Sequence, residues 1–162
     1  MRHTLAVLVQ NQPGVLARVA GLFSRRGFNI ESISVGTTEM PGVSRMTLVA
    51  QADEDELEQL TKQLHKLIDV LKISDITQDE SVDRELALIK INAEPGNRTE
   101  VLQVVDIFRG KIVDVGDRSL IAEVTGATDK VEAMIQLLRP YGIKELVRTG
   151  KVAMVRGSKS IA

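Results

Sequence analysis

The chain has 162 residues, no cysteine, 2% aromatic residues and a formal net charge of −1. The lack of cysteine excludes a disulfide scaffold and a thiolate zinc site, and the near-neutral charge does not indicate a DNA phosphate track or an anionic membrane as partner. The 43% hydrophobic content is typical of a globular protein. The length allows one domain or two small ones, whose aliphatic cores would gain stability from oligomer contacts.

No targeting or membrane segment is expected. The apolar run at residues 5–9 is too short for the hydrophobic region of a signal peptide, and polar residues follow it directly. No apolar run approaches the length of a membrane span. We therefore expect a cytoplasmic protein.

The segment from residue 5 to residue 33 gives the clearest local prediction. Residues 5–9 are apolar and rich in β-branched side chains, which predicts a buried strand. Turn residues follow at 11–14, and then an apolar face of helical spacing. Gly27 is placed to end this helix, and a second strand starts near Asn29.

The turn before this helix is a candidate anion site. The first N–H groups of a helix have no intrahelical acceptor, and the helix dipole places partial positive charge there. Gly14 lets a ligand approach the backbone closely, and the side chain of Asn11 offers a donor and an acceptor. The loop could hold a small zwitterion by its carboxylate and ammonium groups. The alternative is an ordinary strand-to-helix turn with Asn11 as the helix cap.

Two more strands and a helix complete a β-α-β-β-α-β pattern. Residues 30–38 alternate as a strand that places Ile30 opposite Ile33 and Val35, and a turn leads into a strand at 43–50.

The acidic run at residues 53–56 predicts a helix start, because Asp53 and Glu56 have the spacing of a capping box. A metal site there is the weaker interpretation. The helix runs to about residue 68, and a closing strand spans 70–77. This order is that of the ferredoxin-like fold.

A polar stretch at residues 78–84 separates two similar halves. After it, residues 86–96 repeat the pattern of the first strand and turn, with an offset of about 80 residues. We therefore predict an α+β protein with two ferredoxin-like βαββαβ domains, at residues 1–77 and 85–162, joined by a linker at 78–84.

The second half differs from the first at the candidate site. Asn97 and Arg98 follow Gly96 where the first half has an apolar pair, so we place the ligand site in the first half only. Thr128 is expected to cap the last helix. The final residues, 157–162, are small and polar and are expected to be frayed.

The chain has little that could carry catalysis. Its only histidines are His3, expected at the start of an exposed strand, and His65, expected on the solvent-exposed side of a helix. There is no phosphate-binding loop, dinucleotide fingerprint or nucleophile elbow. The few aromatic rings do not match the RNA-binding signature of ferredoxin-like sheets. We expect neither a catalytic nor a metal site and no nucleic-acid partner.

Two motifs carry a resemblance to a known family. Residues 11–16 read N-x-P-G-V-L, and residues 26–32 read R-G-F-N-I-E-S. Together they resemble the ACT domain of the small, regulatory subunit of acetohydroxyacid synthase, also called acetolactate synthase. The similarity covers nearly the whole chain and continues at residues 44–47, 62–70 and 107–115.

The resemblance implies a regulator that binds a branched-chain amino acid, typically valine, between the ACT domains of a homodimer. The matching residues are Asn11, Gly14, Val15 and Leu16 from one chain and Asn29 and Ile30 from its partner. In this interpretation Asn11 holds polar atoms of the ligand, and the residues after Gly14 provide amides and apolar walls.

The resemblance also implies a catalytic subunit that carries thiamine diphosphate, Mg²⁺ and FAD, while this chain carries no cofactor. The chain would activate that subunit and make it sensitive to valine, as part of valine, isoleucine and leucine biosynthesis. The alternative is a free-standing amino-acid-sensing ACT protein that controls another partner.

Overall fold

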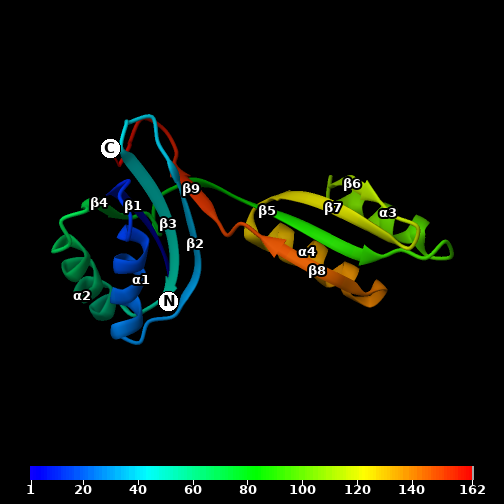
Figure 1. Ribbon diagram of the computed structural model, residues 1–162, viewed down its shortest axis with the longest axis horizontal. Coiled ribbons are helices and arrows are strands. Elements are labelled where there is room, and N and C mark those ends of the chain that lie inside the picture. The colour runs from blue at the N-terminus through cyan, green and yellow to red at the C-terminus, as the bar shows by residue number, and fades with distance from the viewer. Residues whose placement is uncertain (162) are drawn as a thin grey trace. The chain divides into compact units, whose positions relative to one another are not determined.

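The computed structural model describes residues 1–161 and divides into two compact units. The first unit comprises Met1–Val82 and the segment that begins at Lys151, and the second comprises Asp83–Gly150. Each unit contains an antiparallel sheet with two α-helices on one face (Figure 1). The predicted α+β architecture with two ferredoxin-like domains is confirmed.

The first unit follows the predicted β-α-β-β-α-β order. Its elements are β1 (Arg2–Gln10), α1 (Val15–Arg25), β2 (Ile30–Thr37), β3 (Val43–Gln51), α2 (Glu54–His65) and β4 (Val70–Asp75). The strand order is β2-β3-β1-β4, which leaves β2 at one edge of the sheet.

The core of the first unit lies between its sheet and its two helices. Leu5, Val7 and Val9 of β1 pack with Val19 and Phe23 of α1. At the start of α2, the Asp53 carboxylate accepts from the Glu56 N–H at 2.7 Å, and the Asp53 N–H donates to the Glu56 carboxylate at 2.9 Å. The predicted capping box is therefore confirmed.

The second unit repeats the order of the first. Its elements are β5 (Ser81–Asn92), α3 (Arg98–Ile107), β6 (Lys111–Val115), β7 (Ser119–Gly126), α4 (Thr128–Leu138), the 3₁₀ turn η1 (Arg139–Tyr141) and β8 (Ile143–Arg148). The strand order is β6-β7-β5-β8, and β9 (Val152–Val155) also pairs with β5. Ala127 is the N-cap of α4, whereas the Thr128 hydroxyl donates to the Glu85 carboxylate at 3.3 Å.

The division into units differs from the predicted domains in two places. Strand β5 begins at Ser81, inside the predicted linker, and the C-terminal segment (residues 151–161) belongs with the first unit. The expected fraying of residues 157–162 is wrong at Ile161, which is only 4% exposed. Ala162 lies outside the described residues. Ile161 is buried because its side chain packs against apolar side chains of the first sheet.

The helix-free face of the first sheet receives the C-terminal segment. Ala6 and Leu8 of β1 form a small apolar cluster with Ile76, Ala153 and Ile161. Figure 1 shows the C-terminal end of the chain beside the strands of this unit. Strand β1 is therefore covered on both faces, which explains why its middle is apolar at every position.

A register shift in β2 changes the predicted alternation. Ile30 pairs with Ala50 and Ser32 pairs with Val49, so one extra residue lies between them. As a result Ile30 and Ile33 both pack against the core on the helix side, although simple alternation placed them on opposite faces.

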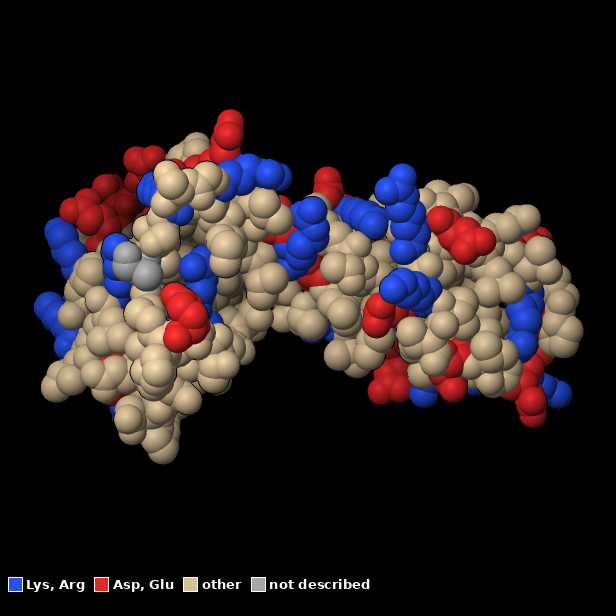
Figure 2. Space-filling model, turned by 90° about the horizontal axis from the view of Figure 1, so that it is seen from above, with Lys and Arg blue, Asp and Glu red and all other residues tan. Residues whose placement is uncertain are grey.

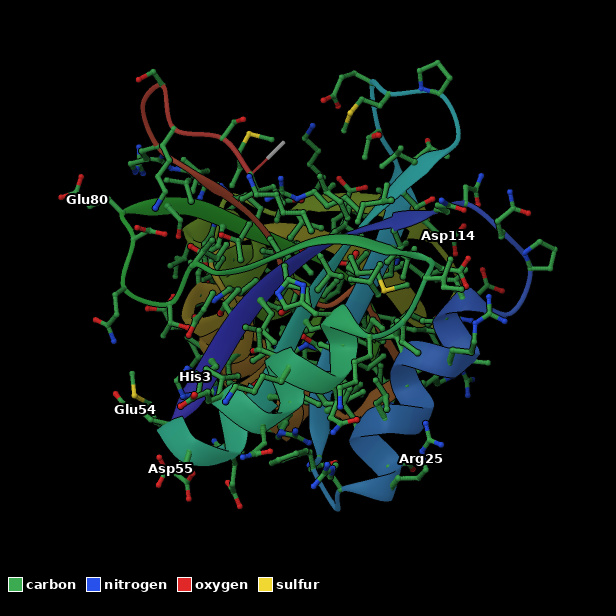
Figure 3. The ribbon with its side chains drawn as sticks, turned by 90° about the vertical axis from the view of Figure 1, so that its left-hand side faces the viewer. His3, Arg25, Glu54, Asp55, Glu80 and Asp114 are labelled. Carbon is green, nitrogen blue, oxygen red and sulfur yellow. The ribbon has the colours of Figure 1, made fainter. Side chains whose placement is uncertain are left out.

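His3 is buried, which contradicts the predicted surface position. It is 4% exposed, and its Nδ1 lies 3.4 Å from the Asp75 carboxylate. The N–H of Ala52, just before α2, donates to the Met1 carbonyl, which extends the pairing of β1 with β3 up to the start of α2. Figure 3 shows His3 beside the turn of α2 that carries Glu54 and Asp55. His65 is exposed, as predicted.

Candidate functional site

The loop between β1 and α1 leaves the start of the helix uncapped. Gly14 is the N-cap residue, with φ of 83°, and no side chain caps the helix. The Asn11 N–H donates to the Gly42 carbonyl at 2.9 Å, which anchors this exposed residue to the β2–β3 turn. The interpretation of Asn11 as the helix cap is therefore wrong, since the left-handed N-cap position falls on glycine.

The electrostatics of this helix end favour an external anion. The first turn of α1 contains no acidic residue, whereas α2 begins with three, at Glu54–Glu56. The guanidinium of Arg18 forms an ion pair with Asp69, and its Nη1 lies 3.2 Å from the position that a Cβ on Gly14 would occupy. The partial positive charge of the helix end is therefore not balanced by a residue of its own first turn, whereas the nearby Arg18 cation is balanced by Asp69.

Apolar side chains near the loop divide into a buried and an exposed group. Val15 is buried in the core, and its N–H donates to the Gln12 carbonyl at 3.4 Å, so the free N–H groups of the first turn follow it. Its predicted role as an apolar wall is therefore not available within this chain. Leu16 is 47% exposed and Val35, near the end of β2, is 45% exposed. These two residues are free to contact a ligand or a second protein.

Asn29 and Ile30 lie at the opposite end of the unit from Asn11 and Gly14. On β3, Gly42 adjoins Asn11, whereas Ala50 pairs with Ile30. At about 3.3 Å per residue, the strand from 43 to 50 separates the two groups by roughly 23 Å. One chain therefore does not bring the six predicted residues together around one small molecule.

Other types of site find no support in the described part of the chain. No group of three or more histidine or acidic side chains within residues 1–161 is placed to hold a metal ion. On the face shown in Figure 2, Lys and Arg are interspersed with Asp and Glu. None of the helices formed by residues 1–161 is both long and apolar enough to cross a membrane.

Comparison with known proteins identifies the family. The family described as AHAS small subunit-like ACT domain matches residues 5–72, and the family described as Small subunit of acetolactate synthase matches residues 84–157. A probable acetolactate synthase small subunit from Archaeoglobus fulgidus is 62% identical over 159 residues, which cover 98% of this chain and 99% of that protein. The chain belongs to the acetolactate synthase small-subunit family.

Two further relatives agree with this assignment. The acetolactate synthase small subunit from Mycobacterium leprae is 54% identical over 98% of this chain and 94% of its own length. The crystal structure of the acetolactate synthase small subunit from Thermotoga maritima is 45% identical, with a TM-score of 0.89 over 98% of this chain and 99% of that chain. The resemblance noted in the sequence is confirmed.

Membership of the acetolactate synthase small-subunit family sets the general role of the chain. It is a regulatory small subunit with an ACT domain, acts in branched-chain amino-acid biosynthesis, and has a catalytic large subunit as its implied partner. The assignment favours a synthase subunit over a free-standing amino-acid sensor.

Sequence reasoning missed the pair formed by Arg18 and Asp69. Arg18 follows Gly14 by four residues, so the helical repeat alone places its side chain near the start of α1. Asp69 lies between α2 and β4, and only the folded sheet brings it there: its carbonyl accepts from the Gln10 N–H at 2.8 Å. Local spacing could have identified the cation but not its counter-ion.

Proposed function

We propose that two copies of the first unit bind valine between them, and that the bound valine inhibits the catalytic subunit that this chain otherwise activates. The observation that supports this most is the separation of the predicted residues into two groups at opposite ends of the unit. Such a pair of half-sites is completed only by a second copy.

Strand β2 offers an edge for that second copy. It lies at the end of the β2-β3-β1-β4 order, so its outer N–H and C=O groups have no strand partner within the unit. Antiparallel pairing of β2 with its two-fold mate would set residues 29–30 of one chain opposite the far end of β2 in the other. That end lies near the loop, because Thr37 pairs with Ser44 and Gln10 pairs with Val43.

The two half-sites offer complementary chemistry for an amino acid. The first turn of α1 supplies N–H groups for the carboxylate, and the Asn11 side chain can accept from the ammonium group. Asn29 of the partner subunit adds a second amide. Leu16 beside the loop and Ile30 of the partner subunit provide aliphatic surface for the valine side chain. An effector acting at about 0.1–1 mM needs roughly 4–5.5 kcal/mol of binding free energy, which a few charge-assisted hydrogen bonds can supply.

The proposed action on the catalytic subunit is a coupling between two sites. That subunit would hold thiamine diphosphate, Mg²⁺ and FAD, and would condense two pyruvates to acetolactate or pyruvate with 2-oxobutyrate. This chain contributes no cofactor in the proposal. Valine can inhibit only if it binds more tightly to one state of the assembly than to the other.

Calorimetric titration tests the proposal directly. Purified chain is titrated with valine, isoleucine and leucine, alone and with the catalytic subunit present, and acetolactate formation is assayed under the same conditions. Saturable valine binding together with valine-sensitive synthase activity is the expected result. If valine fails to bind both the chain and the assembled enzyme, the proposed effector site is wrong.

A further inference from the structure

The C-terminal segment is held to the first unit by apolar burial. Ala153 and Ile161 are 6% and 4% exposed, and they pack with Ala6 and Leu8 of β1 and with Ile76. Val155 of β9 also packs partly against this cluster, whereas residues 156–160 are exposed, so the segment contacts the sheet near both of its ends.

Polar contacts fix the same segment between its apolar ends. The Arg45 side chain donates from Nη2 to the Ala153 carbonyl at 2.7 Å. The Arg156 N–H donates to the Glu80 carbonyl at 2.8 Å, and Lys159 Nζ lies 3.0 Å from the Asp79 carboxylate. Burial lowers the pKa of Arg45, with Glu39 opposing the shift, so the Arg45 guanidinium is partly withdrawn from water at this contact.

The turn between β2 and β3 joins this segment to the candidate effector loop. Met40 and Val43 pack against the cluster that contains Ala153 and Ile161. On its other side, the Gly42 carbonyl accepts the Asn11 N–H at 2.9 Å. A movement of the loop around Asn11 therefore reaches the C-terminal segment through one turn.

We propose that the C-terminal segment is a releasable latch that carries the state of the effector loop to the second unit. The chain enters the second unit after Val82 and leaves it at Gly150, directly before the segment. While the segment is bound to the first sheet, the second unit is tied to the first unit through the chain after Gly150 as well as through the chain before Asp83. Release of the segment removes the tie after Gly150. This inference rests on the proposed valine function, because it requires an effector at the loop. It adds the two-state element through which that effector acts.

The test uses the full chain assembled with its catalytic subunit. Ile161→Asp places a charge in the apolar cluster, and Ser158→Asp places the same charge on an exposed turn of the segment as a matched control. Trypsin cleavage within the segment measures release. We expect cleavage of the Ile161→Asp variant to be about tenfold faster than cleavage of the wild type or the control, because proteolysis follows the population of the open form.

Two functional measurements then decide whether release matters. The Ile161→Asp chain should bind valine within about twofold of the wild type, while the valine concentration needed to inhibit its assembled enzyme rises about tenfold. Ser158→Asp should leave both values unchanged. Normal valine inhibition with a released segment overturns the latch. Failure of the wild type to bind valine instead overturns the proposed function, and the latch with it.

A second variant covers the case in which Ile161→Asp does not fold. Arg45→Met removes the hydrogen bond to the Ala153 carbonyl without leaving a buried charge. Circular dichroism confirms that the variant is folded before the same three measurements are made. Release of the segment with weaker inhibition supports the latch, and release with unchanged inhibition overturns it.

Discussion

The loop between β1 and α1 is open in the first unit, whereas the corresponding loop of the second unit is filled by its own side chain. In the second unit, the Arg98 guanidinium donates to the carbonyls of Ala93, Gly116 and Asp117, at 2.8–3.1 Å from Nη2. Gly96 does not have the positive φ of Gly14, and α3 begins one residue later, after Asn97. The same loop is therefore open to a possible ligand in the first unit, whereas an arginine side chain fills it in the second unit.

The difference depends on which charges the chain itself provides. At the start of α1 no side chain caps the helix and no acid lies in its first turn, while Arg18 pairs with Asp69, so the free N–H groups of the helix end remain open to an external anion. At the start of α3 the Arg98 guanidinium donates to three carbonyls, and Glu100 lies in the first turn. A single arginine two residues after the glycine is sufficient to close the site, because its side chain satisfies the carbonyls that line it.

The largest effect is expected from a carboxylate at the open loop. Gly14→Asp should weaken valine binding by more than about a hundredfold, since a like charge would then occupy the place proposed for the ligand carboxylate and the φ of 83° is strained for a side chain. Gly96→Asp is the matched control, because a Cβ there meets open space. Calorimetry should show unchanged binding for this control. Equal affinity in both variants would contradict the assignment of the site.

Mixing two variants that each fail to bind valine would sharpen the comparison. It tests whether residues of two copies of the chain form one valine site. In the proposed dimer, Gly14→Asp would disable the loop half-site, and Asn29→Lys would disable the other. A mixed dimer keeps one intact site, formed by the loop of the second chain and Asn29 of the first, so binding should return to about one valine per mixed dimer. Each variant alone should bind none. If mixing restores nothing, the two half-sites do not combine across chains.

Removing the arginine of the closed loop should cost stability and not ligand binding. Arg98→Met leaves three carbonyls without their donor, so the free energy of unfolding of the second unit should fall by about 1–3 kcal/mol. Arg18→Met loses one half-exposed ion pair in the first unit and should lower the free energy of unfolding of that unit by less than about 1 kcal/mol. Urea unfolding followed by the fluorescence of Tyr141, the only tyrosine, reports on the second unit, and unfolding followed by far-UV circular dichroism includes the first unit. Equal losses would contradict the described difference.

The smallest effect concerns the ion pairs that hold the second unit together. Arg148 pairs with both Glu85 and Glu132, and its hydrogen bond lowers the pKa of Glu132. The unfolded chain therefore binds a proton more readily, so this contribution is present above the ordinary carboxyl pKa and is lost as pH falls through the lowered value. Because Glu132 is near the surface, Glu132→Gln should cost only a few tenths of a kcal/mol at neutral pH. Urea unfolding at several pH values should show the difference vanishing in acid.

Elements with a strong local pattern could be predicted from the sequence. The apolar face of α1, the capping box of α2 and the repeat of the first strand in the second half gave the correct order of elements. Gly14 was placed correctly at the open end of a helix, because a glycine after proline in a turn is a local signal.

Features that depend on distant parts of the chain could not be predicted in this way. The extra residue in β2 reversed the side of Ile30, the pairing of β1 between β3 and β4 buried His3, and the return of residues 151–161 to the first sheet buried Ile161. Each of these follows from pairing between segments far apart in sequence. The ion pair of Arg18 with Asp69 was missed for the same reason.

The return of the C-terminal segment to the first unit has a consequence for biosynthesis. On the ribosome residues 1–82 emerge early, but Ala153 and Ile161, which cover Ala6 and Leu8, emerge only after the whole second unit. Domains generally fold as they emerge, N-terminal first. Here the nascent first unit must wait with one apolar face of its sheet exposed until the segment after the second unit has emerged. The order of synthesis and the order in which folding finishes are therefore different for this chain, and chaperones have that interval in which to bind it.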